Sequence, residues 1–169
     1  TNIEMMRLLG GSATPMGFGE VYTALQSGII DGAENNEMAL TDNGHGDVCK
    51  YYSYDMHQMV PDILIGNWVF LEGLSEEEQA VFEEGFQIVN RVEREEWVKA
   101  VEHAKERATQ EQHVTFLYPD QKPFVEACRP LHNKVLSRNP GLQTIYEAIQ
   151  SYNQQYPSSA ETLSIQARE

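Results

Sequence analysis

Three side chains that could exchange protons lie close together in the sequence. Asp55, His57 and Asp62 fall between two predicted strands. Histidine titrates near neutral pH and neighbouring carboxylates can orient it, so this set could act as an acid and a base. The same groups could instead hydrogen-bond the hydroxyls of a polyol, or form a hydrated loop. Spacing alone leaves all three interpretations open.

A second polar group lies within and directly after residues 29–34, which we predict to be a short buried strand. Its members are acids and amides: Asp31, Glu34, Asn35, Asn36 and Glu37. Ligands of open α/β sheets bind at the carboxyl ends of strands. Side-chain amides there can donate to a carboxylate without the cost of burying a charge. The alternative is an asparagine-rich turn that serves the backbone only.

Two patterns resemble metal sites without completing one. His103, Glu106, Gln110 and His113 share a predicted helix face, but a di-metal bundle needs Glu-x-x-His on other helices as well, and the sequence has no second copy. Segment 42–47 is similar to a calcium loop but lacks the downstream glutamate. We therefore expect no metal and no other cofactor. The sequence also lacks GxSxG, HExxH and the glycine-rich phosphate motifs, so we nominate no catalytic residue and expect no enzyme.

Composition excludes several classes of partner. The 169 residues include 12 Lys and Arg against 26 Asp and Glu, a formal charge of −14. Nucleic acids and anionic lipids are both bound through clustered cations, so we expect neither as a partner. The apolar content of 41% is enough for a packed core. Cys49 and Cys128 are far apart and are expected to be two thiols.

Hydrophobic periodicity predicts an α/β fold in which strands alternate with helices. Helices are expected at 3–9, 18–27, 120–137 and 141–156, and strands at 12–14, 29–34, 48–54, 63–71 and 114–118. The run 63–71 is almost wholly apolar, which is typical of a strand inside a sheet. Segment 41–47 is rich in Gly, Asn and Asp and is expected to be a loop. The tail from 157 to 169 carries few apolar anchors and is expected to fray.

One predicted helix is unusually long. Ser75 and Glu78 form a capping box, and apolar residues such as Phe82, Phe86 and Trp97 then recur at helical spacing as far as 113. At 1.5 Å per residue such a helix is on the order of 55 Å long, more than the diameter of a small domain. We expect it to bridge two lobes.

Several motifs in a fixed order resemble one known family, the substrate-binding subunits of TRAP transporters (DctP type). The motifs are Pro15 with the helix Phe18-Gly19-Glu20-Val21-Tyr22, then Gly28, Asp31-Gly32-Ala33-Glu34-Asn35, Lys50-Tyr51-Tyr52, His57, Val60-Pro61-Asp62 and Leu74-Ser75-Glu76-Glu77. The resemblance covers essentially the whole chain, but only the C-terminal half of the family pattern. It implies a two-lobed periplasmic binding protein-like fold with a lobe-spanning helix, here in its C-terminal portion.

The resemblance also implies a division of the chain. Residues 1–53 would belong mainly to the second lobe, 54–74 to the crossover strand region, 75–113 to the bridging helix and 114–169 to the C-terminal strand and helices. The family's N-terminal lobe would be absent, together with the strand whose Arg clamps the ligand carboxylate. A guanidinium holds a carboxylate bidentately, so this chain alone is expected to bind weakly or not at all.

The resemblance assigns roles to particular residues. Asn35 matches an Asn that contacts the ligand carboxylate, and Phe18 matches an aromatic residue that packs on the ligand. Glu34 and Asn36 flank Asn35 and would orient it. His57 and Asp62 fall where the crossover strand meets the pocket, as in members that take sugar acids.

The function implied is that of a periplasmic solute-binding component. It would capture a small organic acid, such as a sugar acid, by lobe closure and deliver it to the TRAP membrane permease. The chain would approach the membrane only through that permease. Two alternatives stay open at this point: an α/β enzyme that uses Asp55, His57 and Asp62, or a truncated fragment that binds nothing.

Overall fold

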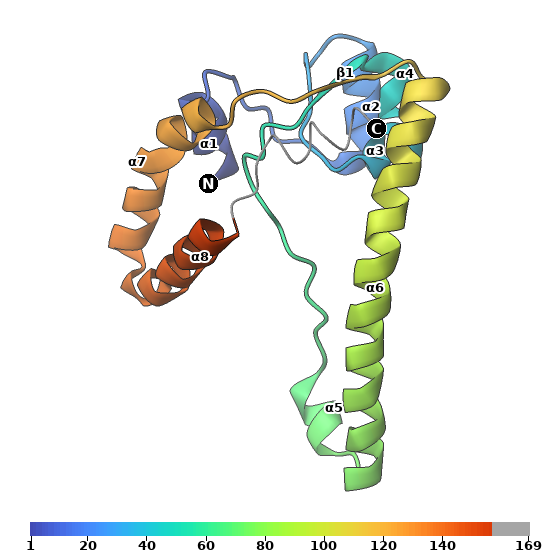
Figure 1. The fold of residues 1–169 in the computed structure, drawn as a ribbon, viewed down its shortest axis with the longest axis vertical. Coiled ribbons are helices and arrows are strands. Elements are labelled where there is room, and N and C mark those ends of the chain that lie inside the picture. The colour runs from blue at the N-terminus through green and yellow to red at the C-terminus, as the bar shows by residue number, and fades with distance from the viewer. Residues whose placement is uncertain (157–169) are drawn as a thin grey trace. The chain divides into compact units, whose positions relative to one another are not determined.

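The computed structural model describes residues 1–156 and divides into two compact units (Figure 1). The first unit contains Thr1–Ala33, Tyr51–Gln58 and the described residues from Thr115 onward. The second contains Glu34–Lys50 and Met59–Val114. The expectation for the tail at 157–169 lies outside the described residues.

The first unit combines helices with a two-stranded parallel sheet. Its elements are α1 (Asn2–Leu8), α2 (Phe18–Gln26), β1 (Tyr51–Ser53), β2 (Thr115–Leu117), α7 (Lys122–Arg138), the 3-10 turn η1 (Pro140–Leu142) and α8 (Gln143–Gln155). The four helices and the strand at 114–118 confirm the sequence predictions. Met5, Cys128 and Leu131 form a small buried cluster where α1 packs on α7. An ion pair of 2.7 Å between Lys134 Nζ and Glu4 Oε1 joins the same two helices.

One face of this sheet is aromatic. In the β1–β2 register Tyr52 lies opposite Phe116, and Tyr54 and Tyr118 follow two residues later, directly after each strand. The Tyr54 and Tyr118 rings stack with centroids 5.1 Å apart, and the Tyr52 and Phe116 rings are 5.5 Å apart. Because side chains alternate along a strand, this spacing of two puts all four rings on one face. These ring contacts fix the carboxyl end of β1, two residues before Asp55.

The second unit is helical. Its elements are α3 (Met38–Thr41), α4 (His45–Val48), α5 (Trp68–Glu72) and α6 (Glu76–Gln110). The capping box at the start of α6 forms as predicted: Glu78 N donates to Ser75 Oγ at 3.3 Å, and Ser75 N donates to Glu78 Oε2 at 2.8 Å. Near the other end Ala104 and Ala108 are buried where α6 packs on α3, because small side chains allow close approach. The long helix is confirmed.

One predicted strand closes a helix instead, and another is confirmed only in its second half. Residues 29 and 30 close α2: Gly28 takes a left-handed φ of 71°, and Ile29 N and Ile30 N both donate to Ala24 O, at 2.9 and 3.3 Å. Glycine permits this turn, and the turn satisfies a carbonyl that the helix leaves without an internal donor. The predicted strand at 48–54 is shortened to Tyr51–Ser53 because residues 45–48 form α4. The loop expected at 41–47 likewise includes parts of α3 and α4.

The predicted strands at 12–14 and 63–71 are also wrong for the described residues. Residues 12–17 and 54–67 have no regular structure, and 68–72 form α5. Asn67 caps α5, since its Oδ1 accepts from Phe70 N at 3.0 Å. A strand needs a neighbour to satisfy its backbone groups, and β1 and β2 are the strands that pair within residues 1–156. No helix in this described part is both long and apolar enough to cross a bilayer.

Candidate functional site

Asp55 and His57 meet just beyond the carboxyl end of β1. His57 Nδ1 lies 2.6 Å from Asp55 Oδ1, and His57 N donates to the same oxygen at 3.3 Å. Between them Met56 has a φ of 54°, a left-handed value that is uncommon for a side chain of this size. That turn brings the flanking side chains together. Their exposed fractions, 17% and 26%, leave the pair half-buried, so the carboxylate fixes the orientation of the imidazole.

Phe18 is the first residue of α2 and remains accessible. Glu20 Oε2 accepts from Gly17 N at 3.1 Å, which completes the capping of this helix end. The helix buries Val21 and Ala24, while 51% of Phe18 is exposed. An aromatic ring held at a capped helix start offers a flat apolar surface for contact with a ligand.

The asparagine pair lies directly before α3. Asn36 N donates to Asn35 Oδ1 at 2.9 Å, and Ala39 N donates to Asn36 O at 3.1 Å in the first turn of the helix. Glu34, Asn35 and Asn36 are all exposed. The contact with Asn36 N directs the Asn35 oxygen at the backbone, and the amide nitrogen is the donor group of this side chain.

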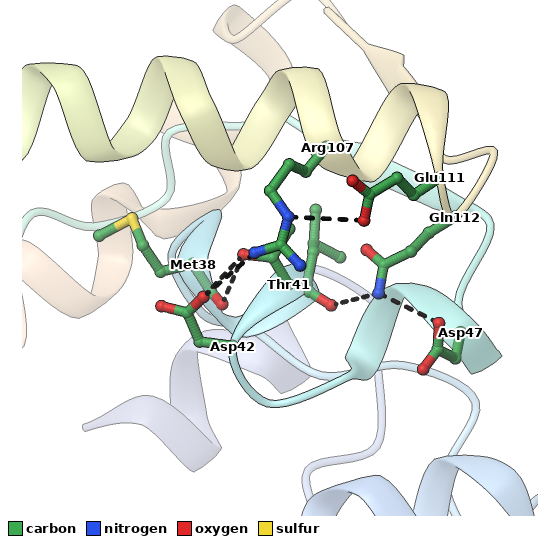
Figure 2. Close-up of polar contacts among 8 residues, drawn as sticks. Met38, Thr41, Asp42, Asp47, Arg107, Glu111 and Gln112 are labelled. Atoms are coloured by element: carbon green, nitrogen blue, oxygen red, sulfur yellow. Dashed lines mark hydrogen bonds and ion pairs between the residues drawn. The ribbon is translucent and has the colours of Figure 1, made fainter.

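A cluster centred on Gln112 holds α3 and α4 against the end of α6 (Figure 2). Gln112 Nε2 donates to Leu40 O at 2.9 Å and to Asp47 Oδ1 at 3.1 Å. Lys50 Nζ donates to Gln112 O and to Gly46 O, both at 2.8 Å. This Gln112 cluster anchors the helix that the asparagine pair precedes.

A second ion-pair network borders the Gln112 cluster (Figure 2). Arg107 lies between two carboxylates, with Nη1 4.0 Å from Asp42 Oδ1 and Nε 3.5 Å from Glu111 Oε2. Neither group could be recognised from the sequence alone. The one available signal was their position at a helix end, where carbonyls and neighbouring turns need donors.

The predicted site residues fall in both units. Phe18 and His57 belong to the first, and Glu34, Asn35, Asn36 and Asp62 to the second. The structure joins His57 to Asp55 and Asn35 to Asn36. Asp62 is exposed within the segment 54–67.

The chemistry of these groups is that of recognition by hydrogen bonds and ring contact. They supply amide donors, carboxylate acceptors, an oriented imidazole and an aromatic face. Among residues 1–156 no cluster of three or more His, Cys, Asp or Glu side chains has the arrangement of a metal site. In the segment compared with a calcium loop, Asp42 and Asp47 contact Arg107 and Gln112 instead.

The fold and these motifs define a class of protein. Residues 1–139 match the bacterial extracellular solute-binding protein family 7, DctP, and the chain belongs to that family. Members of this family are solute-binding proteins rather than enzymes, which speaks against the enzyme alternative at the level of the family.

Particular relatives are similar over most of this chain. The crystal structure of a TRAP periplasmic solute-binding protein from Anaerococcus prevotii, with bound D-glucuronate, is 68% identical with a TM-score of 0.86, over 93% of this chain and 51% of that one. A TRAP protein from Xanthobacter autotrophicus with bound β-D-galacturonate is 32% identical with a TM-score of 0.80, over 88% and 49%. The YiiZ protein of Salmonella typhimurium is 42% identical over 89% of this chain and 46% of its own length. The chain thus spans about half the length of the relatives it matches.

Proposed function

We propose that this chain contributes to the periplasmic solute-binding component of a TRAP transporter, and that its solute is a hexuronate such as D-glucuronate. The observation that carries the proposal is the 68% identity to a TRAP protein whose crystal structure contains D-glucuronate. The bound galacturonate of the Xanthobacter autotrophicus relative supports the same chemical class.

A hexuronate offers a carboxylate, several hydroxyls and one apolar ring face, and the candidate residues suit each. The Asn35 amide would donate to the carboxylate, with Asn36 holding the side chain in place. Phe18 would pack on the ring face. His57, oriented by Asp55, would bond a hydroxyl or the carboxylate.

The two remaining acids would act on the rest of the sugar. Asp62 and Glu34 would accept hydrogen bonds from hydroxyls, which a simple dicarboxylate cannot offer. Carboxylate acceptors form stronger hydrogen bonds than neutral ones and would repel a second anionic group. This arrangement would therefore favour a monoacid rich in hydroxyls over a dicarboxylate.

Capture would work by closure of two lobes around the solute, which removes water and strengthens each polar contact. The closed protein would then deliver the hexuronate to the membrane permease. Because binding needs contacts from both lobes, this chain alone would bind the solute weakly. The bound solute would be released chemically unchanged.

Calorimetry with D-glucuronate tests the proposal. The sample is this chain combined with the half of the Anaerococcus prevotii protein that it does not cover. We expect Asn35→Ala to weaken binding by about 1–3 kcal/mol, roughly fivefold to 150-fold, because the carboxylate loses a donor in a closed site. Asn43→Ala, the same change in an exposed loop of the same unit, is the matched control and should leave affinity unchanged.

A panel of ligands tests the solute class. D-glucuronate and D-galacturonate should bind, while succinate and D-glucose should bind at least about tenfold more weakly, because each lacks one half of the recognition chemistry. Equal affinity for succinate would contradict the hexuronate assignment. Unchanged affinity in Asn35→Ala would remove that residue from the site.

A further inference from the structure

An asparagine followed by a glycine lies in the bend between α3 and α4. Asn43 is exposed there, and Gly44 follows it with a left-handed φ of 71°. Asparagine is a chemically labile residue, and a following glycine has no side chain to hinder attack by its own backbone nitrogen. Asn43 and Gly44 form the only such pair in the 169 residues.

Hydrogen bonds do not hold the two groups that would react. Among the described residues, neither the Asn43 side chain nor the Gly44 backbone nitrogen takes part in one. Asn67 shows the contrast, because its Oδ1 accepts from Phe70 N at 3.0 Å and a tryptophan follows it. The Asn139 amide donates to a backbone carbonyl at 3.0 Å and precedes a proline, which has no N–H. The bend between α3 and α4 therefore combines a reactive pair with a backbone that does not restrain it.

We propose that Asn43 is a site of deamidation, which converts it to isoaspartate and aspartate. The Gly44 backbone nitrogen attacks the side-chain carbonyl carbon of Asn43, and a new N–C bond closes a succinimide ring. The C–N bond of the side-chain amide breaks, and its nitrogen leaves as ammonia with the proton that Gly44 N gives up. One water molecule then opens the ring. Opening at the backbone carbonyl gives isoaspartate, opening at the side-chain carbonyl gives aspartate, and nothing is oxidised or reduced.

Isoaspartate would change the link between α3 and α4 in length. The main chain would run through the side-chain methylene of position 43, which places one extra carbon between Leu40 and Asp47. Gln112 spans this link, since its Nε2 donates to Leu40 O at 2.9 Å and to Asp47 Oδ1 at 3.1 Å (Figure 2). A longer link would move one acceptor away from the shared donor, so we expect the Gln112 cluster to weaken.

The inference does not depend on the proposed solute. The reacting groups belong to adjacent residues, and water is the single co-reactant. The bend and the Gln112 cluster both lie within the second unit. The test therefore needs no ligand.

Peptide mapping of aged protein measures the reaction. The 169-residue chain, combined with the half of the Anaerococcus prevotii protein that it does not cover, is kept in mildly alkaline buffer, and each asparagine is followed by mass spectrometry. We expect Asn43 to convert at least about tenfold faster than Asn67 and Asn139, whose side chains are held. Isoaspartate should accompany aspartate, because both form from the succinimide.

A synthetic peptide of residues 38–48 separates the effect of the fold from that of the sequence. The peptide reports how fast the pair reacts without the fold. We expect the rate in the folded protein to lie within about threefold of the rate in the peptide, a difference smaller than one hydrogen bond would produce.

Two variants separate the reaction from its consequence. Asn43→Gln keeps a side-chain amide but would have to close a larger ring, so it should yield no product in the same period. Asn43→Asp adds the charge without the extra backbone carbon, and its exposed carboxylate is screened by water. In the purified isoaspartate form the amides of Asp47 and Cys49 should exchange at least about fivefold faster than in fresh Asn43→Asp.

Three results would overturn the proposal. They are conversion of Asn43 no faster than that of Asn67, a rate in the folded protein more than about tenfold below that of the peptide, or aspartate as the sole product, which would indicate direct hydrolysis. Equal exchange in the isoaspartate form and in Asn43→Asp would refute the effect on the Gln112 cluster. A protein that ages as expected but ignores D-glucuronate would overturn the proposed function and leave this inference standing.

Discussion

Replacement of Gln112 by alanine should release α3 and α4 from the end of α6. The Gln112 amide nitrogen makes two contacts, to Leu40 O and to Asp47 Oδ1. Alanine removes both at once and leaves the Leu40 carbonyl, in a residue only 4% exposed, without this donor. The asparagine pair directly precedes α3, so the loss would reach the candidate site through that helix.

The magnitude follows from the two contacts. A neutral hydrogen bond contributes about 1 kcal/mol net, and an acceptor left buried without a donor adds about 1 kcal/mol more. Asp47 is exposed, so its contact is screened by water and adds at most a few tenths of a kcal/mol. The total is about 2 kcal/mol, which corresponds to a roughly thirtyfold change in a local opening equilibrium.

Native-state hydrogen exchange measures this opening directly. The amides of Asp42, Asp47 and Cys49 donate within α3 and α4, and each should exchange about thirtyfold faster in Gln112→Ala. Gln110→Ala is the matched control, because the Gln110 side chain donates to the exposed Glu106 on the same helix, and the exchange of these amides should stay near wild type. Unchanged protection of these amides in Gln112→Ala would refute the role of the Gln112 cluster.

Two further predictions concern the same unit. Gly46→Ala should lower the urea midpoint, with a cost of about 1–3 kcal/mol, because a Cβ on Gly46 would collide with the side-chain oxygen of Gln112. Gly19→Ala is the control and should not lower it, because a Cβ there meets open space. Equal midpoints for the two variants would refute the close approach of Gln112 to Gly46. Burial lowers the pKa of His45, so the unfolded chain takes up a proton that the folded chain resists. The free energy of unfolding should therefore be highest above the ordinary histidine pKa of about 6.5 and fall as the pH drops below it. The urea midpoint should be lower at pH 5.5 than at pH 7.5, and His45→Gln should reduce this difference between the two midpoints.

The helices could be predicted from sequence because their signals are local. The capping box at Ser75 and the apolar spacing that follows it identify α6, and the same periodicity identifies α7 and α8. Strands were harder to predict, because an apolar run does not state its partner. Residues 29 and 30 close α2 through Gly28, and residues 63–67 lack a paired strand within the described part of the chain.

The candidate site could be predicted in its residue types but not in its geometry. Asp55 and His57 stood out by chemistry, whereas their contact depends on the left-handed turn at Met56, which no local pattern indicates. Gln112 reaches a carbonyl 72 residues earlier in the chain, a distance over which spacing carries no information. The assignment of Asn35 and Phe18 came from resemblance and remains a prediction.

The central claim is that Asn35 and Phe18 contact the same bound hexuronate. The most direct measurement is a crystal structure of this chain, combined with the other half of the family's fold, in the presence of D-glucuronate. We predict the Asn35 amide nitrogen at about 3 Å from a carboxylate oxygen of the sugar, with the Phe18 ring against its apolar face. A bound glucuronate that touches neither side chain would contradict the account.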